Sequence, residues 1–222
     1  MTTRMTDAVA SSIDAVAPPI VFVVDDDLSV RESLEMLITA AGWQPALFSS
    51  ARSFLEAAQT AAPSCLLLDV NMPDLNGLDL QGMVAQSGNK MPIIFISGYK
   101  DVPATVQALK AGAMDFLTKP IDSAELLGAV RSALARSEAL KHENAALSQL
   151  QQLYDALTPR EREIMVRIIK GLLNKQIAYE LGISEITVKA HRGRLMKKTG
   201  ARSLPELMAM AARLNMDDGV GH

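Results

Sequence analysis

The sequence has a single cysteine, so no disulfide can form within the chain. Cys65 lies inside an apolar run, where a buried and inert thiol is expected, and a reducing cytoplasm suits such a chain. The first 19 residues lack the long apolar core of a signal peptide or membrane span, and we expect them to form a disordered tail. With 49% hydrophobic residues, the 222-residue chain is expected to be soluble, globular and long enough for two modest domains.

Basic and acidic residues are distributed unevenly along the chain. Residues 158–214 hold twelve Lys and Arg against five Asp and Glu, which gives a net charge of +7. The rest of the chain holds ten basic and twenty acidic residues, which gives −10. The basic part indicates a polyanionic partner, although a basic segment can also be only a solvated face.

Short apolar runs alternate with segments of helical periodicity in the first half of the chain. Five such strand and helix units indicate one parallel, doubly wound sheet with helices on both faces, an α/β fold. The expected strands are residues 20–24, 44–48, 65–69, 92–96 and 115–118.

Polar residues follow four of these runs. In a doubly wound sheet the carboxyl ends of the strands meet at one edge, where the ligand site lies. Clustered carboxylates suit a cation with oxygen ligands, such as Mg²⁺, and an ionised Asp69 beside it can accept a phosphoryl group. The Lys119 ammonium and the Ser97 hydroxyl would bind the phosphoryl oxygens. The residues expected at this edge are Asp25, Asp26, Asp69, Ser97 and Lys119.

Each of these residues also has a simpler interpretation. Asp25 and Asp26, with Asp27, can cap the helix that begins near Leu28, and Ser97 can belong to an ordinary turn. We favour the phosphoryl-transfer site because four unrelated turns would otherwise place complementary groups at the same edge by accident.

Residues 20–136 resemble the receiver domains of two-component response regulators, which have a flavodoxin-like (βα)5 fold. The resemblance rests on VVDDD, LLLDVNMPDLNG, FISGY and DFLTKP at the strand ends. It implies that Asp69 is the phosphoacceptor and that Asp25, Asp26, Asp69 and the main-chain carbonyl of Asn71 hold Mg²⁺. It also implies a cis peptide bond between Lys119 and Pro120. Ser97, Phe116 and Lys119 occupy the switch positions, and Phe116 lacks the hydroxyl of a tyrosine.

A long helix is expected over residues 123–155, because this segment has no proline and only one glycine. Residues 137–157 would form a helical linker that continues the last receiver helix. A heptad-like seam favours a parallel coiled-coil dimer slightly over a helix that packs on its own domains. Its members are Leu126, Val130, Ala133, Ser137, Leu140, Asn144, Leu147, Gln151 and Tyr154.

The last part of the chain, residues 158–222, has the helix-start and helix-stop residues expected of a four-helix domain. Thr158 is expected to cap the first helix, with Glu161 completing a capping box. Glycine at 182 and Ser184 separate the second and third helices, which predicts a helix-turn-helix. The third helix has a small, partly basic outward stripe that suits the major groove of DNA.

This part resembles the LuxR-type DNA-binding domain, on the motif TPREREIM…GLLNKQIAYELGISEITVKAHRGRLMKKTGARSLPEL. With the receiver, it resembles the FixJ/NarL class of regulators. The resemblance implies that Lys189 reads bases and that Thr187, His191 and Lys198 contact phosphates. Asn174 and Lys175 match the motif, and Arg192 and Arg194 flank Gly193, where other members present a longer side chain.

These expectations describe a cytoplasmic transcription regulator with Mg²⁺ as its cofactor. Its expected partners are DNA, a sensor histidine kinase, RNA polymerase and, when phosphorylated, a second copy of the chain, but no membrane. It would not be an enzyme beyond its own phosphorylation and dephosphorylation. One alternative is a phosphatase or phosphotransferase, for which the chain has no spare substrate domain. A DNA-binding or scaffold protein that works without phosphorylation is the other.

Overall fold

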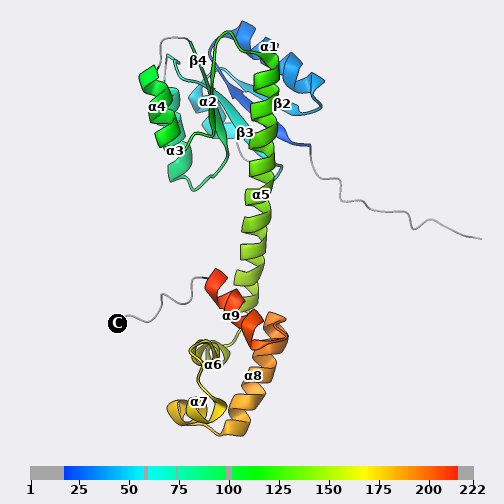
Figure 1. The fold of residues 1–222 in the computed structure, drawn as a ribbon, viewed down its shortest axis with the longest axis vertical. Coiled ribbons are helices and arrows are strands. Elements are labelled where there is room, and N and C mark those ends of the chain that lie inside the picture. The colour runs from blue at the N-terminus through cyan, green and yellow to red at the C-terminus, as the bar shows by residue number, and fades with distance from the viewer. Residues whose placement is uncertain (1–17, 58–59, 74, 99–101, 215–222) are drawn as a thin grey trace, which may run out of the picture. The chain divides into compact units, whose positions relative to one another are not determined.

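Five strands of the chain form one parallel sheet in the order β2-β1-β3-β4-β5 (Figure 1). The computed structural model describes residues 18–57, 60–73, 75–98 and 102–214, and the chain divides into two units, Met1–Lys141 and His142–His222. The three central strands are almost wholly buried, because helices cover both faces of the sheet. The strands are β1 (Ile20–Val24), β2 (Gln44–Phe48), β3 (Ser64–Asp69), β4 (Ile93–Ser97) and β5 (Asp115–Thr118).

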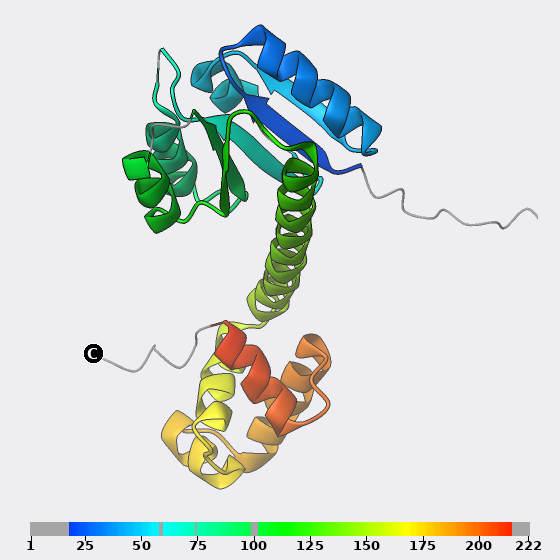
Figure 2. The same ribbon diagram turned by 45° about the horizontal axis from the view of Figure 1, so that its top comes forward.

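Helices α1 and α5 lie on one face of the sheet, and α2, α3 and α4 lie on the other (Figure 2). Alternate residues of a strand therefore enter different cores: Leu67 packs with the α1 and α5 side chains, and Leu66 and Leu68 pack with those of α2 and α3. The α/β doubly wound fold expected of this region is confirmed. The helices are α1 (Leu28–Ala40), α2 (Ala51–Ala57), α3 (Gly77–Gln86), α4 (Val102–Lys110) and α5 (Ser123–Asp155).

Helix α5 is continuous over 33 residues, as the absence of proline predicts. Its first half belongs to the first unit, because Leu126, Val130 and Ala133 are buried in the sheet core. The buried Ser137 hydroxyl accepts a hydrogen bond from the Ser64 amide at 2.9 Å. Lys141 Nζ donates to the main-chain carbonyl of residue 60 at 3.0 Å, so this unit extends beyond the boundary expected at residue 136.

The predicted dimer seam is wrong for this half of α5. Its first four members, from Leu126 to Ser137, face the core of their own unit and are 0–4% exposed. They are therefore not available to a second copy of the chain. The later members lie beyond this core, with Leu147 42% exposed, and for them the coiled coil stays a prediction.

The second unit is a small helical domain whose core is formed by α6, α7, α8 and α9. Thr158 caps α6 and forms the expected capping box with Glu161. Gly182 ends α7 in the left-handed conformation, with φ +63°, so the helix-turn-helix forms where the sequence predicts it. The bounds are α6 (Pro159–Ile169), α7 (Asn174–Leu181), α8 (Glu185–Thr199) and α9 (Leu204–Arg213).

Two expected segments fall partly outside the described residues. Residues 1–17 of the expected N-terminal tail and residues 215–222 at the other end are not described. Within the described part, no helix is both long enough and apolar enough to span a membrane.

Candidate functional site

Three charged side chains meet at the carboxyl edge of the sheet. Asp25 follows β1, Asp69 ends β3 and Lys119 follows β5. The Lys119 Nζ lies 2.8 Å from Asp25 Oδ2 and 2.6 Å from Asp69 Oδ1. Asp25 is 1% exposed and Asp69 5% exposed, so one ammonium group is shared between two buried carboxylates and offsets part of their negative charge.

Main-chain groups fix these carboxylates from the other side. The Asp27 amide donates to Asp25 Oδ1 at 2.8 Å, and the Asn71 amide donates to Asp69 Oδ2 at 2.6 Å. The Lys119 amide donates to the carbonyl of Ser97 at 2.8 Å. The cis peptide bond expected between Lys119 and Pro120 is present. The three charges are thus held by the backbone of four strand ends.

Burial and pairing act in opposite directions on these groups. Burial raises the pKa of Asp69, and the nearby Asp25 adds to this rise, while hydrogen bonding to Lys119 lowers it; the net pKa lies above its ordinary value. For Lys119, burial lowers the pKa, but the hydrogen bonds to both carboxylates outweigh burial and raise it overall. The lysine is therefore held in its charged form between the two acids.

The helix cap in this region is Asp27, not Asp25 or Asp26. Asp27 Oδ1 accepts hydrogen bonds from the Ser29 and Val30 amides at 2.8 and 3.4 Å, at the start of α1. Asp26 is exposed and forms no hydrogen bond or ion pair with the rest of the described chain. The capping interpretation thus explains one acid of the three and leaves Asp25 and Asp26 to other roles.

Ser97 and Phe116 lie beside this cluster, on β4 and β5. Ser97 is fully buried at the end of its strand. The Phe116 ring is half-buried and stacks on Phe95 with 6.4 Å between the ring centroids. The structure therefore places Ser97 at the same edge as Asp69, whereas Phe116 lies farther back along β5, level with Phe95.

The donor set expected for Mg²⁺ consists only of oxygen atoms. Carboxylates of Asp25, Asp26 and Asp69 with the carbonyl of Asn71 suit this hard cation by their chemistry. Among the described residues, however, no group of three or more His, Cys, Asp or Glu side chains is close enough to hold a metal ion. The residues are therefore of the right chemical type for Mg²⁺, but a carboxylate must move before three of them can bind one ion.

Gly77 is a residue of this site whose role the sequence did not reveal. It begins α3, and a Cβ atom there would clash with the main-chain oxygen of Asp69 and approach the Phe95 ring to 3.1 Å. Its amide donates to the carbonyl of Val70 at 3.1 Å. Glycine thus allows α3 to start directly against the end of β3.

The residues expected at a nucleic-acid interface lie on α7 and α8 of the second unit. Lys189 is exposed on α8 and pairs with Glu185 at 3.2 Å. Thr187 contributes to the cap of α8, because its amide and hydroxyl both contact Ser184 Oγ. Arg192 Nη1 donates to Asn174 Oδ1 at 3.2 Å and so links α8 to the start of α7.

His191 and Arg194, two further residues expected at this interface on α8, differ in their burial. His191 is half-buried, and its Nδ1 atom is buried without a hydrogen-bond partner. Arg194 is exposed and donates from Nε to the carbonyl of Ala190 at 3.4 Å. Both remain on the same helix as Lys189, as expected.

Lys198 has an internal role that the sequence did not indicate. Its Nζ lies 2.8 Å from Glu161 Oε2 and 3.1 Å from the carbonyl of Ala156. Glu161 is 2% exposed, and the bonds from Lys198 and the Thr158 amide lower its pKa to about 2. This ion pair competes with the phosphate contact expected of Lys198, which stays a prediction.

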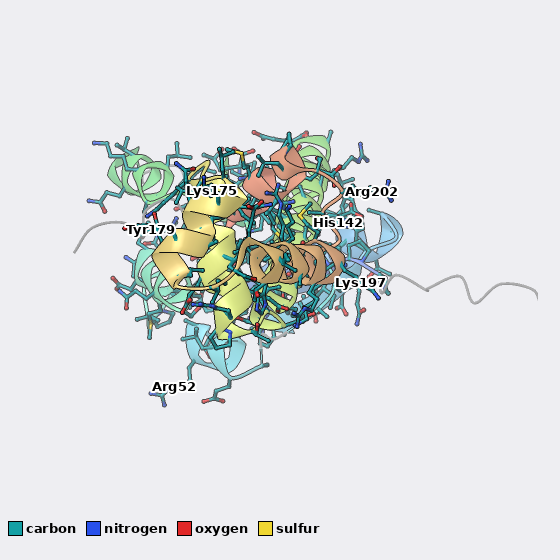
Figure 3. All side chains as sticks on the ribbon, turned by 90° about the horizontal axis from the view of Figure 1, so that it is seen from below. Arg52, His142, Lys175, Tyr179, Lys197 and Arg202 are labelled. Atoms are coloured by element: carbon teal, nitrogen blue, oxygen red, sulfur yellow. The ribbon has the colours of Figure 1, made fainter. Side chains whose placement is uncertain are left out.

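Among the exposed cations of the second unit that lack an acidic partner in the described chain are three on or next to α7 and α8. Lys175 on α7, Lys197 on α8 and Arg202 after α8 are exposed and form no ion pair within the described part of the chain (Figure 3). Lys197 belongs to the basic run 197–198, which the sequence places on the cationic flank of the third helix. Free cations near a helix-turn-helix suit a phosphate backbone.

Comparison with protein-family models gives two matches. Residues 21–131 match the response regulator receiver domain, and residues 155–211 match the bacterial regulatory proteins of the luxR family. Together these matches cover the sheet edge around Asp69 and the helix-turn-helix.

Curated relatives match nearly the whole chain. Nodulation protein W of Bradyrhizobium diazoefficiens is 45% identical over 203 residues, which cover 91% of this chain and 89% of that protein. The response regulator protein TmoT of Ectopseudomonas mendocina is 44% identical, with 88% and 89% covered. The transcriptional regulatory protein FixJ of Azorhizobium caulinodans is 42% identical, with 86% and 90% covered.

Two solved structures also match along most of the chain. The response regulator StyR has a TM-score of 0.80 and 43% identity, with 89% of this chain and all of that chain covered. Full-length FixJ from B. japonicum has a TM-score of 0.55 and 37% identity, with 90% and 98% covered.

Proposed function

Since the chain belongs to the two-component response regulators that join a receiver domain to a LuxR-type DNA-binding domain, we propose that a sensor histidine kinase phosphorylates it on Asp69. The observation that carries this proposal is the pair of buried carboxylates, Asp25 and Asp69, held by the single ammonium group of Lys119. This cluster of two carboxylates and one ammonium, with the exposed acid Asp26 beside it, suits the transfer of a dianionic phosphoryl group.

The reaction is a displacement at phosphorus. A carboxylate oxygen of Asp69 forms a bond to the phosphorus of a phosphohistidine as the phosphorus–nitrogen bond breaks, and the electron pair of that bond stays on the imidazole. Lys119 then neutralises the new phosphoryl oxygens, and the Ser97 hydroxyl donates a hydrogen bond to one of them. The Asn71 amide continues to hold the second carboxylate oxygen.

Asp25, Asp26, Asp69 and the carbonyl of Asn71 would hold Mg²⁺ at this edge. When bound, the ion supplies positive charge that offsets the repulsion between the carboxylates and the incoming phosphoryl group. The exposed Asp26 is the acid with the most freedom to complete this set, because neither a hydrogen bond nor an ion pair ties it to the described residues.

Phosphorylation would change the surface next to β4 and β5. The new charge attracts Lys119 and Ser97. The half-buried Phe116 ring on β5 then changes its position. Helix α4, which packs beside β5, carries Val106 and Leu109, which are 46% and 48% exposed. Such a patch of apolar side chains suits a second copy of the chain, so the phosphorylated form would dimerise.

A dimer presents two copies of α8 to paired half-sites in DNA. Lys189 is the side chain for base readout, because it is 63% exposed and Glu185 is its only acidic partner in the structure. Asn174, Lys175, Thr187, His191, Arg192 and Arg194 are the supporting contacts, whereas Lys198 is held by Glu161 instead.

The remaining partners follow from this role. A DNA-binding regulator works in the cytoplasm and would contact RNA polymerase at its promoters. It would catalyse only its own phosphorylation and dephosphorylation, because the one constellation of this kind in the described part of the chain is the Asp69 cluster.

Incubation with acetyl phosphate and Mg²⁺, followed by intact-protein mass spectrometry, tests the phosphoacceptor role. One added phosphoryl group in the wild type and none in Asp69→Asn would support it. Rapid multiple turnover of acetyl phosphate without a modified protein would instead favour a phosphatase. Asp79→Asn, an exposed acid in the first turn of α3, is the matched control and should be phosphorylated like the wild type.

A further inference from the structure

The first unit has a cleft at the edge of the sheet opposite to Asp69. Its volume is about 550 Å³, within the range typical of small-molecule sites. It lies at the amino ends of β4 and β5, where α3, the turns before these strands and α5 meet. We call it the amino-edge cleft, lined by Gln81, Val84, Ala85, Asn89, Lys90, Met91, Met114, Arg136 and Leu140 among others.

The residues that line the cleft are mostly apolar, and the charged ones among them are all positive. Lys90 and Arg136 are the two charged residues of the amino-edge cleft, and no acidic residue lines it. Neither cation forms an ion pair with any described residue of the chain. Two unpaired cations beside apolar walls attract an anion that also has an apolar part.

A buried amide contributes to the wall of the cleft. Gln81 is 3% exposed, and its Nε2 donates to the carbonyls of Ala108 and Ala111 at 3.3 and 3.2 Å, at the end of α4. Its Oε1 atom is buried and has no hydrogen-bond partner among the described residues. Because this oxygen and a carboxylate are both acceptors, Gln81 forms part of the wall only, and the case for an anion rests on Lys90 and Arg136.

We infer that the amino-edge cleft binds a small apolar monocarboxylate. The apolar body of such a molecule would cover Val84, Met91 and Met114, and its carboxylate would pair with Lys90 and Arg136. A polyphosphate would leave the apolar walls uncovered, and a neutral apolar molecule would leave both cations unpaired. The site is separate from the Asp69 cluster and does not depend on the function proposed above.

Three probes of eight carbon atoms each test this assignment: octanoate, octan-1-ol and octylammonium. Met91 and Met114 line the cleft, whereas Met36 is 74% exposed on α1, outside it. In full-length protein labelled with ¹³C at the methionine methyl groups, octanoate should shift the Met91 and Met114 signals in a saturable way. The Met36 signal should stay in place, and octan-1-ol and octylammonium should bind at least about tenfold more weakly.

Charge reversal provides a control that does not depend on loss of binding alone. Arg136→Glu should weaken octanoate binding by about tenfold or more and reverse the preference toward octylammonium. Arg131→Glu, an exposed position of the same helix that does not line the cleft, should bind all three probes like the wild type. The inference is overturned if octanoate causes no saturable shift, if all methionines shift together, or if Arg136→Glu keeps the preference for octanoate.

Discussion

At the scale of single residues, close approach and buried charge decide how the receiver site and the DNA-binding unit hold together. Gly77 lets α3 start against Asp69, and Lys119 is shared between two buried acids. Glu161 does comparable work in the second unit, where it accepts bonds from the Thr158 amide and Lys198. For Gly77 and Glu161, a residue nearby in the sequence serves as a control: Gly82 and Glu163.

Gly77→Ala should destabilise the first unit by roughly 1–3 kcal/mol, because the added methyl group would clash with the Asp69 carbonyl. It should also slow phosphorylation of Asp69 by displacing that strand end. Gly82→Ala on the same helix meets nothing within 4 Å and should be neutral or slightly stabilising. Urea unfolding followed by Trp43 fluorescence measures both, and equal effects of the two substitutions would refute the close-approach argument.

Glu161→Gln should destabilise the second unit by about 1–2 kcal/mol at neutral pH, the usual scale for a lost cap. The pKa of Glu161 is lowered from 4.5 to about 2 by Lys198 and the Thr158 amide. Its contribution is therefore complete above pH 4.5 and is lost as the pH falls toward 2.

The stability difference between Glu161→Gln and the wild type should thus shrink over this acidic range. Urea titration followed by the methyl signal of Met165, buried in the core of the second unit, measures it. Glu163→Gln is the control, because Glu163 is exposed and pairs only with Arg160 beside it. A difference that is constant from neutral to acidic pH would contradict the assignment.

At the scale of elements, local sequence patterns predicted the strands and helix ends well, but they did not predict contacts between residues far apart in the sequence. The apolar runs gave the five strands, and capping residues such as Thr158 and Gly182 gave the helix ends of the second unit. The heptad spacing on α5 misled, because a helix that covers a sheet needs the same apolar stripe as one that pairs with another helix.

Other features of these elements depend on contacts between residues far apart in the sequence. The Glu161–Lys198 pair spans 37 residues and the Ser64–Ser137 bond spans 73. No local pattern predicts such partners. The site acids were found because strand ends converge in any doubly wound sheet, whereas the tight packing at Gly77 depends on the exact position of α3.

The anchoring of α5 can be tested at Ser137. Ser137→Ala removes the acceptor of the buried Ser64 amide and should destabilise the first unit by about 1–3 kcal/mol. Ser132→Ala is the matched control, because the exposed Ser132 hydroxyl bonds only to the carbonyl of Gly128 in its own helix. Thermal unfolding followed by Trp43 fluorescence compares them. Equal stability of the two variants would mean that the hydroxyl does not anchor the helix.

At the scale of the whole molecule, charge separates the two parts of the chain. The segment 158–214 has a net charge of +7 and the rest has −10. The basic part suits DNA, and the acidic part carries the cluster that would receive phosphate. Part of this positive charge is compensated within the second unit, because Lys198, Arg160 and Arg167 each have an acidic partner in the protein.

Salt dependence distinguishes a DNA contact from a structural cation. Lys175→Ala should weaken DNA binding uniformly and reduce the slope of log K against log salt by about 1, because Lys175 is unpaired and exposed. Lys198→Ala should lower the stability of the second unit and leave this slope unchanged, because its partner is Glu161. A reduced slope with unchanged stability in Lys198→Ala would assign that lysine to phosphate instead.

The central claim is that phosphate on Asp69 controls DNA binding by the second unit. Fluorescence anisotropy of a promoter fragment, titrated with wild type and Asp69→Asn with and without acetyl phosphate and Mg²⁺, tests it most directly. We expect acetyl phosphate to tighten binding by the wild type at least about tenfold, the scale of typical allosteric coupling, and to leave Asp69→Asn unchanged. Equal affinity of both proteins under both conditions would contradict the account.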